Sequence, residues 1–142
     1  MAQGDVTKFE ELSLQIADGT FDMDNDSFSL KLITTLPTAA QTTPNLSDFT
    51  EVTAGGGYTT GGIALTTTWT ESGGTATFDS STNPSWTAAA SSPTNIIAGL
   101  IVNGSDNAVA FVDLTTDGST PISLVDGNIT VTWNASGIFT IS

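Results

Sequence analysis

Residues 96–102 read Ile-Ile-Ala-Gly-Leu-Ile-Val, an apolar run with no polar position on either face. Such a run indicates a strand buried on both sides, because alternate side chains of a strand point to opposite faces of a sheet. The turn Asn103-Gly104-Ser105-Asp106 follows, and residues 108–114 form a second strand pattern. Residues 96–102 are therefore predicted to be a central strand of a β-sheet, with the strand at 108–114 following it.

Alternating apolar and polar residues predict further strands on both sides of this centre. The chain is rich in Thr, and β-branched residues suit a pleated, half-buried surface. Asp126-Gly127 separates two of the strand patterns and predicts a hairpin. About eight strands indicate a mainly β fold, an antiparallel two-sheet sandwich of Ig-like or jelly-roll-like type. The strand patterns outside the centre cover residues 28–32, 63–69, 76–78, 122–125, 129–133 and 138–141.

The period-2 spacing of large apolar residues predicts the core of this sandwich. We expect the following residues to be mostly buried between the two sheets: Phe28, Leu30, Leu32, Leu65, Trp69, Phe78, Ile97, Phe111, Trp133 and Phe139.

The N-terminal region has a helical pattern. Thr7-Lys8-Phe9-Glu10 has the spacing of a capping box with Thr7 as N-cap, apolar residues recur on one helical face, and Gly19 could end the helix. Apolar residues between 12 and 16 also alternate as a strand would. A short helix is the preferred interpretation, and the strand stays open as the alternative.

The length of 142 residues indicates one domain, residues 1–142. Residues 1–8 are interpreted as an N-terminal arm, and residues 37–48, rich in Thr, Ala and Pro, as a long loop. A long loop in a compact domain is usually functional or disordered. Both segments are expected to be mobile in the free protein and to become ordered on docking.

Charge is strongly unbalanced, with 15 acids against two bases, Lys8 and Lys31, and a net charge of −13. Binding to nucleic acid or to an anionic membrane depends on Lys and Arg, so neither is an expected partner. The charge suits solubility and also a partner protein with a basic docking face, and the two interpretations are compatible.

The residue inventory argues against catalysis. The chain has no His and no Cys, which removes the usual general base and the usual thiol nucleophile. No motif marks a carboxylate pair of the glycosidase kind. We therefore expect no enzyme activity, no catalytic residues and no cofactor.

Two motifs have a binding-site reading and a structural one. Asp22-Met23-Asp24-Asn25-Asp26 resembles the start of a Ca²⁺ loop, but Ser27 replaces the required Gly and Ile33 replaces the bidentate Glu. We expect an acidic turn whose carboxylates bond the local backbone, and no metal site.

Gly55–Gly62 is Gly-rich but lacks the Lys of a phosphate-binding loop. It is interpreted as a tight turn leading into a strand, with Tyr58 as its anchor.

Trp69, Trp86 and Trp133 are candidates for an aromatic sugar-binding platform. Two of them stand within strand patterns, so core packing is the preferred interpretation. Trp86, in the segment Asn83-Pro84-Ser85-Trp86-Thr87, is the one expected to be most exposed.

The order of these pieces resembles a family of small bacteriophage structural proteins. The shared pattern is an acidic turn, a Leu-rich strand, a Gly-Tyr-Thr-x-Gly-Gly segment and a later Trp. Here the pieces are Gly19–Asp24, Ser29–Thr34, Asp48–Val52, Gly57–Leu65, Ala76–Asp79, Trp86 and the strand at Ile96. The resemblance covers about Phe9 to Ile141. Family members usually carry a basic residue near Ala98-Gly99, and this chain has none. The resemblance therefore supports no inference about contacts made at that strand.

The resemblance implies a virion part with no enzymatic activity, made in the host cytoplasm. A capsid decoration or cement protein on the outer head surface is the preferred function, with the major capsid protein and other copies of this chain as partners. A tail or fibre-base component is one alternative. A free-standing glycan-binding module is the other.

Overall fold

The fold is mainly β, with 35% of the chain in strands, 6% in helix and antiparallel sheets. A computed structural model describes residues 2–142. The elements are β1 Val6–Lys8, α1 Leu12–Ala17, β2 Phe28–Ile33, the 3-10 helix η1 Leu46–Asp48, β3 Ile63–Leu65, β4 Thr67–Ser72, β5 Thr75–Ser80, β6 Ser85–Trp86, β7 Ala98–Val102, β8 Ala108–Asp113, β9 Ile129–Thr130 and β10 Phe139–Ile141.

The centre of the molecule is a five-stranded sheet with the order β1-β8-β7-β2-β3. Its neighbours are antiparallel throughout, with Leu100 opposite Phe111 in β7 and β8 and Leu30 opposite Ile101 in β2 and β7. Every residue of β7 and β8 is buried. The predicted central strand at residues 96–102 is therefore confirmed, because a strand can be buried on both sides only where both faces of its sheet are covered.

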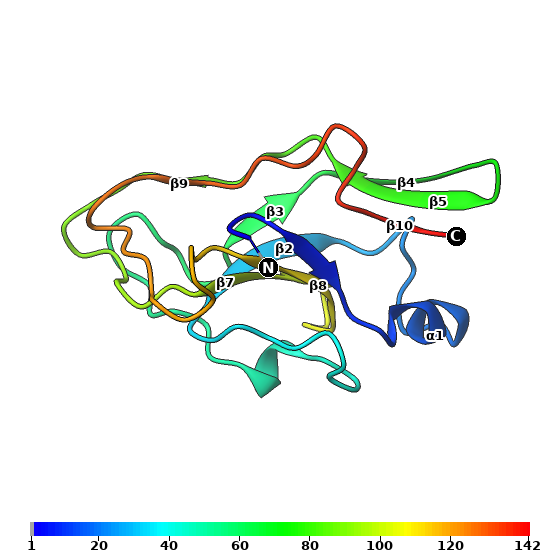
Figure 1. Ribbon diagram of the computed structural model, residues 1–142, viewed down its shortest axis with the longest axis horizontal. Helices are drawn as coiled ribbons and strands as arrows, with labels where there is room; N and C mark the ends of the chain where they lie inside the picture. Colours follow the sequence, from blue (N-terminus) through cyan, green and yellow to red (C-terminus); the bar gives the residue numbers. More distant parts are fainter. Residues whose placement is uncertain (1) are drawn as a thin grey trace.

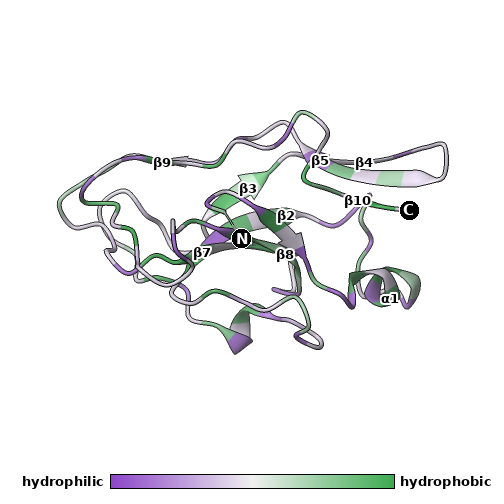
Figure 2. Cartoon of the chain, viewed as in Figure 1, coloured by the Kyte–Doolittle hydropathy of each residue, from purple (hydrophilic) through white to green (hydrophobic). Residues whose placement is uncertain are grey.

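A second layer covers one face of this sheet (Figure 1). It consists of a three-stranded sheet, β10-β5-β4, and a two-stranded sheet, β6-β9. Figure 2 shows hydrophobic residues along β2 and β3 in the sheet beneath. The stacked layers are compatible with a β-sandwich. The main core lies between them and includes Phe28, Leu30, Leu32, Leu65, Phe78 and Trp133, as predicted.

The other face is covered by the segment between β2 and β3, which includes the loop 37–48. Leu36, Leu46 and Phe49 pack there against a second apolar cluster. The loop, which was expected to be mobile, is hydrogen-bonded to the segment around β8: Ala108 N donates to Pro44 O at 2.9 Å, and Leu46 N donates to Asp106 O at 2.8 Å. The segment is held in place because it shields apolar side chains that would otherwise face water.

Four predicted core residues differ from the expectation. Ile97 and Phe111 are buried, but in the second cluster, beneath this loop and not between the sheets. Trp69 and Phe139 are only partly buried. Both stand on the outer strands of the three-stranded sheet, β4 and β10.

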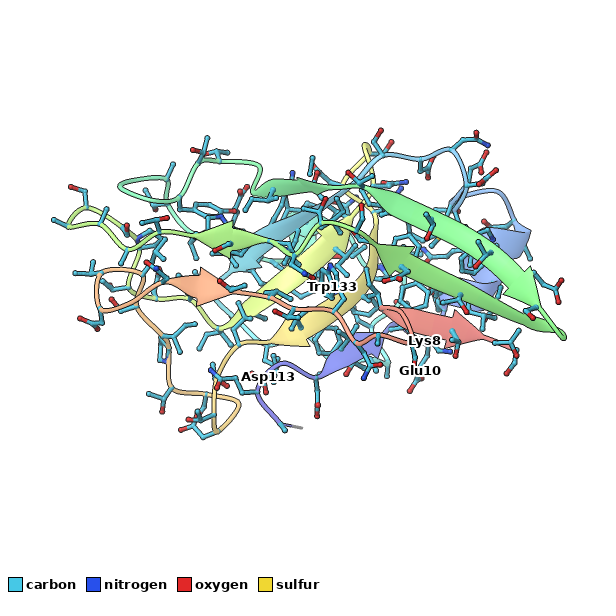
Figure 3. The ribbon with its side chains drawn as sticks, turned by 90° about the horizontal axis from the view of Figure 1, so that it is seen from above. Lys8, Glu10, Asp113 and Trp133 are labelled. Atoms are coloured by element: carbon cyan, nitrogen blue, oxygen red, sulfur yellow. The ribbon has the colours of Figure 1, made fainter. Side chains whose placement is uncertain are left out.

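The N-terminal expectations also need correction. Thr7 does not cap a helix: it lies in β1 and faces Phe111 of β8. The helix α1 begins five residues later, at Leu12, and its N-cap Glu11 makes no side-chain capping bond. The arm is docked as well, because Val6–Lys8 pair with β8 and Lys8 Nζ donates to Thr140 O at 2.6 Å (Figure 3). Met1 lies outside the described residues.

The predicted hairpin at Asp126-Gly127 is wrong. Ile122 forms a bridge with Ile96, and Ile129 pairs with Trp86 of β6. The two flanking segments therefore pair with distant partners, where Ile129 contacts the buried Trp86 and Ile122 pairs with the buried Ile96.

Candidate functional site

The Gly-rich segment 55–62 forms a tight turn closed by its own backbone. Gly55 N donates to Tyr58 O at 2.9 Å, and Tyr58 N donates to Gly55 O at 3.0 Å. Its backbone also lies close to the loop that follows β6: Gly57 N donates to Ser92 Oγ at 2.9 Å, and a Cβ at Gly57 would overlap with Thr87 O. The predicted role as a turn leading into β3 is confirmed.

Tyr58 anchors this turn in the core, as predicted. The side chain is 2% exposed, and its ring lies 6.1 Å from that of Trp86. The hydroxyl accepts a bond from Leu32 N of β2 at 3.1 Å and donates to Glu51 Oε1 at 2.7 Å. The same carboxylate oxygen accepts from Gly61 N at 2.6 Å. Burial, then the neighbouring Glu51 carboxylate, raise the pKa of Tyr58 far above its ordinary value.

Three loops meet around this turn at one end of the molecule, and none carries a charged residue. They are residues 53–62, 87–97 and 119–125. Ala89 N donates to Leu124 O at 3.3 Å, and Leu124 N donates to Pro93 O at 3.0 Å. Asp117 and Asp126 flank the last of these loops. We call the three loops the neutral end.

The opposite end of the long axis carries a concentration of acids (Figure 1). It consists of residues 10–26, which include α1 and the turn after it and contain no Lys or Arg. We call this segment the acidic end. Its acids are Glu10, Glu11, Asp18, Asp22, Asp24 and Asp26, of which Glu11 and Asp26 are half-buried and the others exposed. The fold therefore separates the surface into two chemically different ends.

The carboxylates of the acidic turn 22–26 bond to the local backbone, as predicted, and Asp26 also bonds to the distant Asn103. Asp22 Oδ1 accepts from Asp24 N at 3.2 Å and from Asn25 N at 3.1 Å. Asp26 Oδ2 accepts from Asp22 N at 3.2 Å and from Asn103 Nδ2 at 3.1 Å. The Asn25 side chain, followed by its backbone N–H, lowers the pKa of Asp22. Within residues 2–142, no group of three or more acids has a metal-binding arrangement.

The three tryptophans do not share a surface. Trp86 is 4% exposed, so the expectation that it would be the most exposed is wrong. It is buried because its ring fills the space beneath the neutral end, beside Tyr58. Trp133 is also buried, and its Nε1 donates to Thr82 O at 2.7 Å. Only Trp69 is partly exposed, on the edge strand β4.

A hollow of about 270 Å³ lies where β9 faces the N-terminal segment. Gln3 and Gly4 line one side, and residues 128–132 line the other. None of the described residues that line it has an ionisable side chain. The hollow therefore offers shape and hydrogen bonds but no acid–base chemistry.

No protein-family model, curated protein or solved structure matches the chain. Among residues 2–142, no helix is long and apolar enough to cross a membrane.

Sequence reasoning missed the neutral end as a single surface. A signal was present, because residues 52–70 and 80–105 contain no charged residue although the chain carries 17. That these stretches meet at one end depends on the pairing of β6 with β9 and of Ile96 with Ile122. These contacts are distant in the sequence, and no local pattern announces them.

Proposed function

We propose that this chain is a non-enzymatic bacteriophage virion protein, a capsid decoration or cement protein that binds the outer head surface through its neutral end. The partner is the major capsid protein. The proposal is supported by the resemblance of the sequence to small phage structural proteins and by one structural observation, the separation of the neutral end from the acidic end.

The neutral end has the chemistry of a contact surface. The buried centre of a protein–protein interface is depleted of charged residues, because a charge that loses its water needs a partner. The loops 53–62, 87–97 and 119–125 contain no charge that docking would desolvate. Val125, 39% exposed, adds an apolar group to this surface.

The neutral end is also ordered before docking. Its loops are joined by backbone bonds such as Leu124 N to Pro93 O, and Ala88 N donates to Asn128 Oδ1 at 2.8 Å. Ordering a free segment costs about 1–2 kcal/mol per residue, so a preformed surface binds with a smaller entropic penalty. Preformed loops replace the mobile arms expected from the sequence.

The acidic end has a separate role in this proposal. With the neutral end on the head, residues 10–26 point away from it (Figure 1). Like charges at this end keep neighbouring copies and other particles apart.

A tail or fibre-base position is the structural alternative. A glycan-binding module has less support, because Trp86 and Trp133 are buried and only Trp69 is accessible. The assignment of the sandwich as Ig-like or jelly-roll-like stays a prediction, and the proposed function does not depend on it.

A charge placed at each end tests the proposal. Thr94→Glu adds a carboxylate to an exposed position of the neutral end, and Ser13→Glu adds the same group to an exposed position of α1. Each purified variant is mixed with phage heads that lack the protein, and bound protein is measured after sedimentation of the heads. We expect Thr94→Glu to weaken attachment about tenfold or more, because burying an unpaired charge is unfavourable by several kcal/mol. Ser13→Glu is expected to attach like the wild type.

Two outcomes would contradict this account. Normal attachment of Thr94→Glu with weakened attachment of Ser13→Glu would move the contact to the acidic end. Failure of the wild-type chain to attach to any head preparation would remove the decoration function itself. Circular dichroism of both variants verifies that each is folded.

A further inference from the structure

The strand β4 is an open edge of the second layer. It is the last strand in the order β10-β5-β4, and β5 is its partner in that sheet. Its six residues pair with β5 in unbroken register, from Thr67 opposite Ser80 to Ser72 opposite Thr75. It contains no Pro, Lys, Arg or bulge, and Glu71 is its one charged residue, so few of the features that usually protect an edge from pairing with another chain are present.

The backbone groups that point out of this edge follow from the pairing. In an antiparallel pair, successive residues of one strand point their N–H and C=O groups alternately toward the partner and away from it. Ser81 N donates to Thr66 O at 3.0 Å, so the even-numbered residues of this segment face β5. Thr67, Trp69 and Glu71 therefore direct their N–H and C=O groups outward.

We propose that a second copy of this chain pairs with β4, antiparallel and centred on Trp69. In this register Trp69 faces Trp69 of the other copy, Thr67 faces Glu71, and Thr68 faces Thr70. The three outward-directed residues of each copy meet those of the other, which gives about six backbone hydrogen bonds between the copies. The two three-stranded sheets become one continuous sheet.

The composition of the β4 edge favours a second copy as the occupant. Two chains of net charge −13 repel each other over most of their surfaces. The β4 edge carries one acid, Glu71, whose Oε1 already accepts from Gly74 N at 2.6 Å. The proposed register places Glu71 against a Thr hydroxyl and never against the other Glu71. A strongly basic partner strand would find a single acid to pair with on this edge, whereas a Thr-rich strand with few charges complements it. The strand β4 has this composition.

The side chains are also self-complementary. Trp69 lies on the inner face, where its ring packs 6.5 Å from Phe78 in an edge-on arrangement. Two such rings side by side would shield each other's exposed part. On the outer face the contact consists of Thr68 and Thr70, which are exposed, and Figure 2 shows the β4–β5 hairpin in pale colours of intermediate hydropathy. Figure 3 shows the hairpin along one side of the molecule and β1 with β10 along the other.

Paired substitutions test both the edge and the register. Thr68→Lys with Thr70→Lys places like charges directly opposite each other in the proposed dimer. Thr68→Lys with Thr70→Glu places opposite charges there. Both variants keep the same Lys beside Asp79, which faces residue 68 within the sheet, so the folded monomer is affected similarly. Sedimentation velocity over a concentration series gives the dissociation constant of each dimer, and circular dichroism verifies the fold.

We expect the wild type to dimerise and the double-Lys variant to dimerise about tenfold more weakly, because two like-charged cross-strand pairs oppose the contact. The Lys/Glu variant is expected to match or exceed the wild type. The double-Lys variant has the lower net negative charge, so general repulsion cannot explain a loss of its dimer. A monomeric wild type, an unaffected double-Lys variant, or equal weakening of both variants would each overturn the proposal. The measurement uses no phage heads, so its outcome is independent of the proposed function.

Discussion

At the scale of single residues, Tyr58 connects the most parts of the structure. Its hydroxyl bonds the backbone of β2 through Leu32 N and the side chain of Glu51, and its ring packs beside Trp86. The sequence allowed its role as an anchor to be predicted, since a lone aromatic residue in a Gly-rich turn has few other uses. It did not allow the hydroxyl partners to be predicted, because they come from segments that only the tertiary fold brings together.

Removing this hydroxyl should destabilise the fold. Tyr58→Phe keeps the ring but leaves Leu32 N without its partner in a buried environment. We expect the free energy of unfolding to fall by about 1–3 kcal/mol, the usual result of leaving a buried donor unsatisfied. Denaturant unfolding followed by tryptophan fluorescence measures it. An unchanged midpoint would show that the bond contributes nothing to stability.

The same hydroxyl makes the fold sensitive to alkali. The folded state raises the pKa of Tyr58 above its ordinary value of 10.0, so its stabilising contribution is complete below pH 10 and is lost as pH rises further. Tyr58 is the only tyrosine in the chain, so phenolate absorbance reports on this residue alone. We expect that absorbance to appear together with unfolding. Titration near pH 10 in a chain that is still folded would contradict the buried, bonded hydroxyl.

At the scale of elements, the sequence predicted strands well where the apolar pattern was continuous. Residues 96–102 were predicted as a central strand because no polar residue interrupts either face, and β7 is buried throughout. The strand predicted at residues 108–114 includes Asp113, and β8 is also buried throughout. The prediction failed where local signals competed with distant partners. Thr7 has a capping-box spacing, yet the pairing of β1 with β8 places it in a strand. Asp126-Gly127 reads as a hairpin, yet Ile122 and Ile129 pair elsewhere.

The glycines before β3 offer a test of how closely this strand must approach β2. Gly61 and Gly62 both have positive φ, 97° and 67°, but only at Gly62 would a Cβ overlap with backbone, the carbonyl of Leu30. We expect Gly61→Ala to destabilise by about 1–3 kcal/mol through its backbone conformation alone. Gly62→Ala should add a further roughly 1–3 kcal/mol of steric strain. Thermal unfolding compares the two, and equal losses would exclude the close approach of β3 to β2.

At the scale of the whole molecule, the uneven distribution of charge is the feature that most bears on function. Composition alone revealed the excess of acids, and for this reason neither nucleic acid nor an anionic membrane is expected as a partner. The grouping of acids in residues 10–26 was visible in the sequence, whereas the assembly of three uncharged loops at the other end was not. The loops meet because of long-range pairings that follow from the whole fold.

Lowering the pH should reveal how much the ionised Asp117 side chain contributes to the stability of the fold. Bonds from the Thr120 side chain, then from the Thr120 and Ser119 backbone, lower the pKa of Asp117 to about 2. The contribution of the Asp117 carboxylate to the stability of the fold is therefore complete above the ordinary carboxyl pKa. This contribution is lost as pH falls through about 2. We expect Asp117→Asn to be less stable than the wild type at neutral pH and equally stable below about pH 2. Melting temperatures measured across this range test it, and a difference that persists in strong acid would contradict the assignment.

The proposal that the chain decorates a phage head is tested most directly by its copy number in intact particles. Virions of the phage that encodes the chain are purified, washed, and analysed by quantitative mass spectrometry against the major capsid protein. The account predicts a fixed copy number per particle, close to the copy number of the major capsid protein. It also predicts that the protein is absent from preparations of isolated tails. Its absence from washed virions, or a copy number of a few per particle that follows the tails, would contradict it.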